Sequence, residues 1–207
     1  MKRKSIIDIK KQKGKEAIVC LTAYTAPIAR AIDKYVDVLL VGDSLGMVLY
    51  DYENTLPVTL NQMIEHSKSV VGASKKSCVI VDMPFGTYEE SKNLAFNNAA
   101  RIMKETYCNG VKLEGGKKVA KTIKYLTRSS IPVMGHIGVL PQSEKGKFKH
   151  KGKTEREKNQ LLNDAKLLQK LGVFSIVLEC VESKTAKMIT KLIKIPTIGI
   201  GSSKYCD

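Results

Sequence analysis

Residues 38–48 read VLLVGDSLGMV, an apolar run that ends in a glycine, a carboxylate and a hydroxyl. Three further segments repeat this pattern: CVIVDMPFG (78–86), GVKLEGG (110–116) and FSIVLEC (174–180). A helix cap would explain one acid at the end of an apolar run, but not the same feature on four segments. The four acids are Asp43, Asp82, Glu114 and Glu179.

Seven short apolar segments predict β-strands. Their apolar residues are consecutive rather than alternating, which is typical of strands covered on both faces in a parallel sheet. The segments are AIVCLTAY (17–24), VDVLLVGDS (36–44), CVIVDM (78–83), GVKLEG (110–115), IPVMGH (131–136), FSIVLE (174–179) and IPTIGIG (195–201).

Helical patterns lie between the predicted strands. Three capping boxes mark helix starts, because a hydroxyl and an acid or amide three residues later satisfy free backbone amides reciprocally. The boxes are Thr59–Gln62, Thr87–Glu90 and Thr154–Glu157. Two shorter helices are predicted at PIARAIDKY (27–35) and SKTAKMITKLIK (183–194).

This alternation of strand and helix, without a break in composition, predicts one α/β domain over residues 1–207. Right-handed crossovers leave a doubly wound sheet or a (β/α) barrel as the main options. The first unit, LTAYTAPIARA (21–31), has no glycine and so no dinucleotide-binding fingerprint. Acids at the ends of several strands favour a barrel, in which all carboxyl ends of the strands face one mouth.

Composition restricts the class of protein. A chain of 207 residues that is 43% hydrophobic supports one substantial core. It contains no apolar run of about 18 residues, no secretory signal pattern and no CxxC pair among its five cysteines, so we expect a cytoplasmic protein without a membrane partner. The net charge of +15 would suit a nucleic-acid partner, but no such binding motif accompanies it. Lysines spread over solvated helix faces are the favoured interpretation.

The acids of three successive strands suggest a metal site. Neighbouring strands lie about 4.8 Å apart, so the carboxylates of Asp43, Asp82 and Glu114 can converge. Unpaired carboxylates in a mouth repel one another, and a divalent cation removes this repulsion. Oxygen ligands favour Mg²⁺ before Mn²⁺. Taken singly, each acid could instead cap the next helix.

Other polar residues fall at the same strand ends. Lys112 shares a strand face with Glu114 and could hold an anionic substrate group or form a structural ion pair. Ser44 could bind the same anion or cap a helix, and His136 ends the fifth predicted strand. Glu179 lies across the mouth from the other acids, which suits a base, because a metal-bound carboxylate is a poor proton acceptor. Its alternative role is to pair with a lysine of a neighbouring loop.

Two loops carry weaker signals. The lysine-rich loop 144–158 is long for a connection between strand and helix, so it is interpreted either as a lid or as a surface loop. The turn GIGSS (199–203) could cradle a phosphate, although a lone glycine-rich turn is a weak indication.

Together, the segments closely resemble the ketopantoate hydroxymethyltransferase family over residues 15–207. The resemblance implies a (β/α)8 TIM-type barrel of the phosphoenolpyruvate/pyruvate-like kind, a homo-oligomer (a decamer), Mg²⁺, and 5,10-methylenetetrahydrofolate as co-substrate. The segments that carry it are LTAYTAPIA (21–29), VGDSLGMV (41–48), VDMPFGTY (81–88), VKLEGG (111–116), IPVMGHIGVLPQS (131–143), VLECV (177–181) and IPTIGIG (195–201).

The resemblance also implies roles for the residues at the strand ends. Asp43 and Asp82 match metal ligands that also contact the substrate, and Glu114 matches a third acid that acts through water. The remaining matches are Ser44 and Lys112 to residues that hold the keto acid, His136 to the substrate pocket, and Glu179 to the catalytic base.

The implied reaction transfers a hydroxymethyl group to 3-methyl-2-oxobutanoate through a Mg-stabilised enolate. The product is 2-dehydropantoate, in the first step of pantothenate and coenzyme A biosynthesis. Related lyases and mutases of this barrel type carry a KKCGH-like motif, which is absent here. The alternatives are an inactive or split-gene fragment of the enzyme, or a basic polyanion-binding protein.

In the family, an eighth strand follows the point that corresponds to Asp207, where this sequence ends. We therefore expect a C-terminally truncated barrel that lacks this strand. The first and seventh strands would then have open apolar edges, and the chain would associate or be poorly soluble.

Overall fold

A computed structural model describes residues 3–144 and 149–207, which contain one sheet of seven parallel strands. The strands lie in the sheet in the same order as in the chain, from β1 to β7. Their bounds are Cys20–Thr22, Val38–Val41, Cys78–Asp82, Gly110–Glu114, Val133–Gly138, Ser175–Glu179 and Thr197–Ile200. This order is that of a barrel rather than of a doubly wound sheet, and all seven predicted strands are confirmed.

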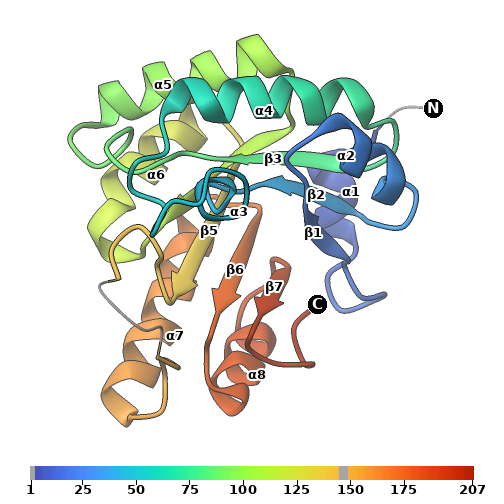
Figure 1. Cartoon of the computed structure of the whole chain (residues 1–207). Coiled ribbons are helices and arrows are strands. Elements are labelled where there is room, and N and C mark those ends of the chain that lie inside the picture. Colours follow the sequence, from blue (N-terminus) through green and yellow to red (C-terminus); the bar gives the residue numbers. More distant parts are fainter. Residues whose placement is uncertain (1–2, 145–148) are drawn as a thin grey trace.

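Helices cover the outside of the nearly closed barrel (Figure 1). Helices α4 and α5 lie along one side, and α7 and α8 cover the later strands. The bounds are α1 Ile6–Lys11, α2 Ala26–Ile32, α3 Leu45–Leu49, α4 Leu60–Ala73, α5 Lys92–Thr106, the 3-10 turn η1 Lys117–Val119, α6 Ala120–Arg128, α7 Glu155–Lys170 and α8 Ser183–Leu192. No helix in the described part of the chain is both long enough and apolar enough to cross a bilayer.

Two apolar clusters explain why the strand residues are apolar without alternation. Residues such as Leu39, Val79 and Val111 belong to the larger cluster, which includes apolar residues from the surrounding helices. Their sequence neighbours Val38 and Cys78 point to the opposite face and belong to the smaller cluster inside the barrel. Both faces of the central strands β3, β4 and β5 are therefore buried, as in other parallel sheets.

Helix α1, which the sequence patterns did not predict, closes the floor of the barrel. A capping box formed by Ser5 and Asp8 starts this short helix. Ile9 is fully buried and belongs to the interior cluster at the amino ends of the strands. The interior is therefore filled by side chains below the mouth and is not a pore.

The edges of β1 and β7 have no strand-to-strand pairing in the described residues. Asp207 bridges their amino ends, because its backbone N–H donates to the carbonyl of Thr197 (3.0 Å) and its carbonyl accepts from Ile18 N–H (2.7 Å). Further along the two edges, Leu21 and Ile200 are about half exposed. The predicted open apolar edges are therefore present, while the predicted association of the chain stays a prediction.

Two of the three predicted capping boxes are confirmed, at Thr59 and Thr154. The third, at Thr87, is wrong. The Thr87 hydroxyl donates to the carbonyl of Pro84 (2.6 Å) within a turn, and α5 is capped instead by Ser91, whose Oγ accepts from Leu94 N–H (3.1 Å). A turn that follows proline here competes successfully with the capping box.

Asp33 joins the end of α2 to the loop between α4 and β3. Its carboxylate accepts hydrogen bonds from Ser74 Oγ (2.6 Å) and from the backbone N–H groups of Lys75 (2.8 Å), Lys76 (3.0 Å) and Ser77 (3.0 Å). Burial alone raises the pKa of Asp33, but these hydrogen bonds outweigh it and lower the pKa to about 2. The ionised form of Asp33 therefore stabilises the folded chain.

We predict that Asp33→Asn lowers the free energy of unfolding at pH 7 by about 2 kcal/mol, because the amide cannot accept all of these bonds. Since the pKa of Asp33 is depressed in the folded state, its contribution is complete above about pH 5 and is lost progressively as the pH falls through the folded pKa of about 2. Urea denaturation from pH 7 to 2.5 measures this dependence. The exposed Asp51→Asn is the control, and equal stability of the two variants at pH 7 would contradict the assignment.

Candidate active site

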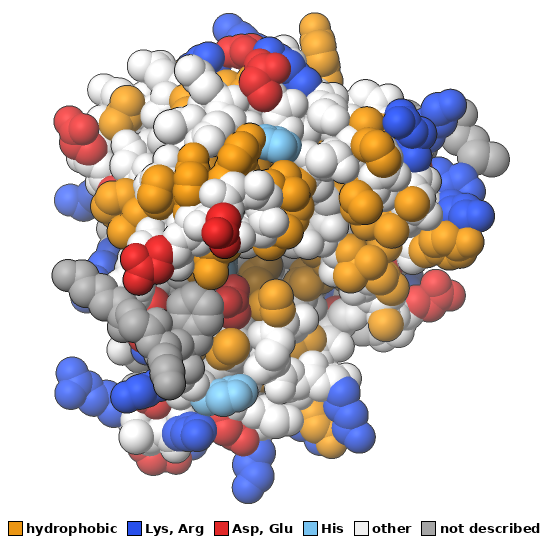
Figure 2. All heavy atoms as spheres, in the orientation of Figure 1, with side chains coloured by type: hydrophobic (Ala, Val, Ile, Leu, Met, Phe, Trp, Pro, Cys, Tyr) orange, Lys and Arg blue, Asp and Glu red, His pale blue; other side chains and the backbone are white. Residues whose placement is uncertain are grey.

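A cavity of about 400 Å³ opens at the carboxyl ends of the strands. The face of the molecule drawn in Figure 2 is hollowed near its middle, and many of its lysines and arginines lie around the periphery. The apolar walls of the cavity include Leu40, Val177 and Ile198. Its polar lining contains every residue that the sequence predicted for the site: Asp43, Ser44, Asp82, Lys112, Glu114, His136 and Glu179.

Asp43 and Asp82 form a buried carboxylate pair, 4% and 3% exposed. Asp82 Oδ2 accepts from the backbone N–H of Asp43 (3.2 Å), which joins the turn after β2 to the end of β3. Lys112 lies beside Asp82 in the register of β3 and β4, and its Nζ is 3.0 Å from Asp82 Oδ1. Asp82 Oδ1 makes no hydrogen bond, so this contact is an ion pair without hydrogen-bond geometry.

The charges of this pair are only partly compensated. Burial is the main cause that raises the pKa of Asp43, repulsion from Asp82 adds to it, and Lys112 opposes both. The net effect is a pKa of about 7 for Asp43. Burial likewise raises the pKa of Asp82 despite its contact with Lys112. The pair therefore binds a proton readily, and a cation would stabilise its fully ionised form.

His136 lies between two further acids. It neighbours Glu114 in the register of β4 and β5, and its Nδ1 is 3.5 Å from Glu114 Oε1. Its Nε2 is 3.3 Å from Glu179 Oε2 on the other side. Burial and nearby Lys112 lower the pKa of His136, but its contacts with Glu114 and Glu179 outweigh them and raise it. His136 is thus a buried link between Glu114 and Glu179.

Ser44 and Glu179 are the more accessible polar groups of the lining. The Ser44 hydroxyl lies 2.8 Å from the hydroxyl of Tyr24, which follows β1, and it does not cap α3. The Glu179 side chain is 17% exposed, against 2% for His136. A ligand in the cavity can therefore reach both Ser44 and Glu179.

Three polar residues of the site were not predicted as site residues, although each lies in a segment that carries the family resemblance. Tyr24 contacts Ser44, while Gln142 and Tyr88 contact the acids and are 4% and 2% exposed. Gln142 and Tyr88 lie in loops, where polar residues are usual and no periodicity marks those that turn inward. In contrast, a position at the end of a predicted strand identified every acid that lines the cavity.

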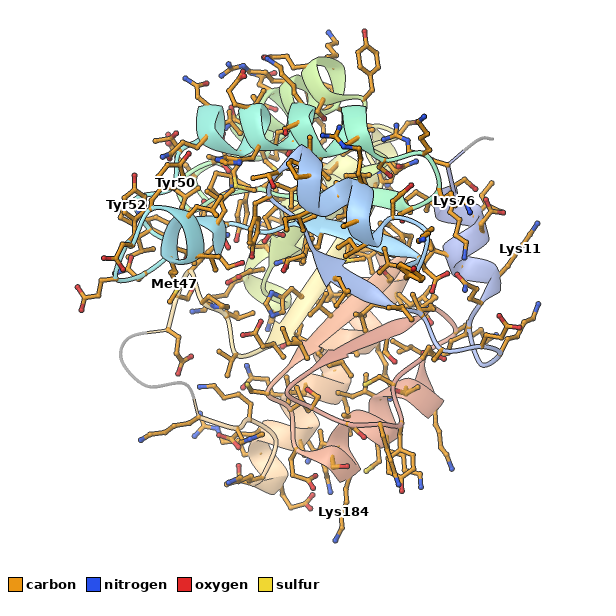
Figure 3. The ribbon with its side chains drawn as sticks, turned by 45° about the vertical axis from the view of Figure 1, so that its right-hand side comes forward. Lys11, Met47, Tyr50, Tyr52, Lys76 and Lys184 are labelled. Atoms are coloured by element: carbon orange, nitrogen blue, oxygen red, sulfur yellow. The ribbon has the colours of Figure 1, made fainter. Side chains whose placement is uncertain are left out.

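Helix α3 and the residues after it form a rim beside the cavity. Met47 lines the cavity, and the rings of Tyr50 and Tyr52 stack with centroids 5.5 Å apart. Figure 3 shows these three residues together at one side of the molecule, opposite Lys76 and Lys11 near the floor of the barrel. The mouth and the floor therefore lie at opposite ends of the barrel.

In the turn after β7, the Ser202 hydroxyl is used within the protein, and phosphate binding by this turn stays a prediction. The Ser202 hydroxyl donates to the carbonyl of Leu178 (2.6 Å) and accepts from Val181 N–H (2.9 Å), so it ties β7 to the end of β6. The start of the neighbouring helix α8 is capped by the carboxylate of Glu182. In the lysine-rich loop 144–158, residues 145–148 lie outside the described part of the chain, and the proposal of a lid is not tested.

One observation supports a divalent cation at the carboxylate pair. Asp82 Oδ1 is buried and has no hydrogen-bond partner, and Asp82 lies beside a second carboxylate, that of Asp43. In the described residues, no group of three or more His, Cys, Asp or Glu side chains is arranged to hold a metal ion. Glu114 is held instead by other groups, because its Oε2 accepts from Gln142 N–H (3.1 Å). The residues thus fit a cation held by Asp43 and Asp82, with its other positions open to small ligands.

A solved structure with the same type of barrel is similar to this chain. A solved 2,3-dimethylmalate lyase, a member of the PEP mutase/isocitrate lyase superfamily, superposes with a TM-score of 0.66 over 94% of this chain and 70% of that chain. At 13% sequence identity this likeness concerns the fold alone, and it confirms the predicted barrel type.

The family model for ketopantoate hydroxymethyltransferase matches residues 3–207. The 3-methyl-2-oxobutanoate hydroxymethyltransferase of Pelagibacter ubique (strain HTCC1062) is 56% identical over 204 residues, which cover 99% of this chain and 79% of that protein. The protein of the same name from Paramagnetospirillum magneticum (strain ATCC 700264 / AMB-1) is 52% identical over 209 residues, 100% of this chain and 76% of that protein. The chain belongs to the ketopantoate hydroxymethyltransferase family.

The position of Lys112 predicts a large effect on stability. In metal-free buffer at pH 7, Lys112→Met should lower the free energy of unfolding by about 3 kcal/mol or more, because it leaves buried carboxylates uncompensated. The deficit should shrink towards pH 5, since protonated carboxylates need no counter-charge. Urea denaturation of this variant and of the exposed control Lys118→Met measures both effects. Equal stability of the two variants at pH 7 would contradict the charge balance described above.

Proposed function

We propose that this chain transfers a hydroxymethyl group from 5,10-methylenetetrahydrofolate to 3-methyl-2-oxobutanoate, giving 2-dehydropantoate. The observation that carries this proposal is a single cavity that brings together a carboxylate pair, an ammonium group and a separate, more exposed carboxylate. These are the groups needed to bind an anionic keto acid and to remove a proton beside its carbonyl. Family membership supplies the identities of the two substrates.

The keto acid is held by groups of both charges. Lys112 provides an ammonium group for the substrate carboxylate, and the Ser44 hydroxyl can donate to the same group from the turn after β2. The apolar side chains of Leu40, Val177 and Ile198 suit the two methyl groups of the substrate.

Asp43 and Asp82 would hold the divalent cation, for which Mg²⁺ is the first candidate. When bound, this cation supplies Lewis-acid stabilisation of charge on the keto oxygen of the substrate. Asp43 must be ionised to bind it, and its pKa of about 7 lets cation and proton compete near neutral pH. Glu114 is proposed as an outer acid that acts through water, because it is already hydrogen-bonded to protein groups.

Glu179 is proposed as the base that removes the proton from C3 of the keto acid. His136 lies 3.3 Å from Glu179 Oε2 and can hold that carboxylate in place. The electron pair of the broken C–H bond becomes the enolate and then forms the new bond from C3 to the methylene carbon of the folate. Both bonds from that carbon to the folate nitrogens break, and water supplies the hydroxyl oxygen. Tetrahydrofolate leaves with one proton from water and the proton that Glu179 took from C3. Assembly as a homo-oligomer and location in the cytoplasm also belong to this proposal. The first rests on the family resemblance and the second on the composition of the sequence.

The base assignment predicts the behaviour of Glu179→Gln. Formation of 2-dehydropantoate should fall by about 10²-fold or more, because the amide cannot accept the C3 proton. The affinity for the keto acid should change little, and the exposed Glu53→Gln should retain full turnover. Turnover assays together with binding titrations measure both quantities. An equal loss of binding and turnover in Glu179→Gln would place Glu179 among the substrate ligands and contradict its role as the base.

A further inference from the structure

Gln142 reaches the carboxylate cluster from the loop after β5. The residue follows the end of β5 by four positions and is 4% exposed. Its side chain contacts Asp43 from the turn after β2, and its backbone contacts Glu114 from β4. A neutral loop residue thus meets two acids that come from different strands.

Every polar atom of the Gln142 amide has a partner. Nε2 donates one hydrogen to Asp43 Oδ2 (2.7 Å) and the other to the carbonyl of Met83 (2.9 Å). Oε1 accepts from the hydroxyl of Tyr88 (2.5 Å). The reverse amide orientation would place Oε1 against a carboxylate and a carbonyl, both of which are acceptors. The direction of the amide is therefore fixed by its neighbours.

Tyr88 fixes the amide in turn. Its hydroxyl donates to Gln142 Oε1 and accepts from the backbone N–H of Glu114 (3.3 Å), and the ring is 2% exposed. A buried hydroxyl with both functions satisfied has little freedom to rotate. The chain of contacts thus runs from the backbone of β4 through Tyr88 and Gln142 to the Asp43 carboxylate.

We propose that Gln142 is a positioning residue that holds Asp43 Oδ2 and leaves Asp43 Oδ1 for a divalent cation, with Tyr88 fixing the amide of Gln142. This inference rests on the proposed metal site at Asp43 and Asp82. A hydrogen bond from the protein to a ligating carboxylate orients it before the metal binds, and loss of such a partner typically costs about 10–100-fold in metal affinity.

The neutrality of Gln142 suits this role. A lysine or arginine at this position would stabilise ionised Asp43, but its positive charge would oppose the cation electrostatically. An amide donates to the carboxylate without adding charge. Lys112 pairs with Asp82 and not with Asp43, so Gln142 is the side chain that donates to Asp43 in the described residues.

The test measures Mn²⁺ affinity at pH 7.5 by electron paramagnetic resonance, in the full chain without substrates. Gln142→Met keeps the length of the side chain but removes both donors, so the Mn²⁺ dissociation constant should rise by about 10-fold or more. Tyr88→Phe removes only the hydroxyl that fixes the amide and should give a smaller rise. The exposed Gln160→Met, the matched control, should bind Mn²⁺ like the parent chain.

The outcomes separate this inference from the proposed function. If the parent binds Mn²⁺ and both the Gln142→Met and Tyr88→Phe variants bind it equally well, the positioning role is overturned while the metal site stands. If the parent binds no Mn²⁺, the metal site itself is overturned, and the positioning role with it. If Gln142→Met does not fold, Tyr88→Phe decides: weakened binding supports the inference, and parental affinity overturns it.

Discussion

The site depends on the electrostatic repulsion between two carboxylates that are held side by side in the mouth of the barrel. Asp43 and Asp82 are both almost completely buried, and Lys112 forms an ion pair with Asp82. Two ionised acids in such a place are unfavourable, so the pair gains stability from a proton or from a divalent cation. The raised pKa values of both acids express this requirement. The proposed metal binding and enolate chemistry are consistent with this constraint.

The barrel makes this arrangement possible because apolar residues fill its floor while the residues of the site lie at its mouth. The interior cluster and Ile9 of α1 fill the floor, and the charged residues that line the cavity lie near the mouth. The parallel register then places acids beside basic partners, Asp82 next to Lys112 and Glu114 next to His136. Glu179 lies on a later strand and is more exposed than His136, which suits its proposed role as the base.

Much of this architecture could be predicted from the sequence because the signals are repeated along it. Consecutive apolar residues gave all seven strands, and the acids at their ends identified the lining of the cavity. The sequence patterns failed where the structure depends on contacts between residues that lie far apart in sequence. Helix α1 is short and depends on packing of Ile9 against the barrel, while Gln142 is a loop residue whose importance follows only from its contact with Asp43, far away in sequence. The incorrect capping box at Thr87 has a local cause instead, because the Thr87 hydroxyl donates to the carbonyl of Pro84 within a turn.

The two buried acids are proposed to form a site for the keto acid together with a divalent cation. Isothermal titration of the chain with 3-methyl-2-oxobutanoate, with and without Mg²⁺, measures whether the keto acid needs the cation to bind. Binding that requires Mg²⁺ is the predicted result, since without the cation the repulsion between the carboxylates and the anionic substrate opposes entry. Equal affinity for the keto acid in the presence of Mg²⁺ and of a chelator would contradict the account.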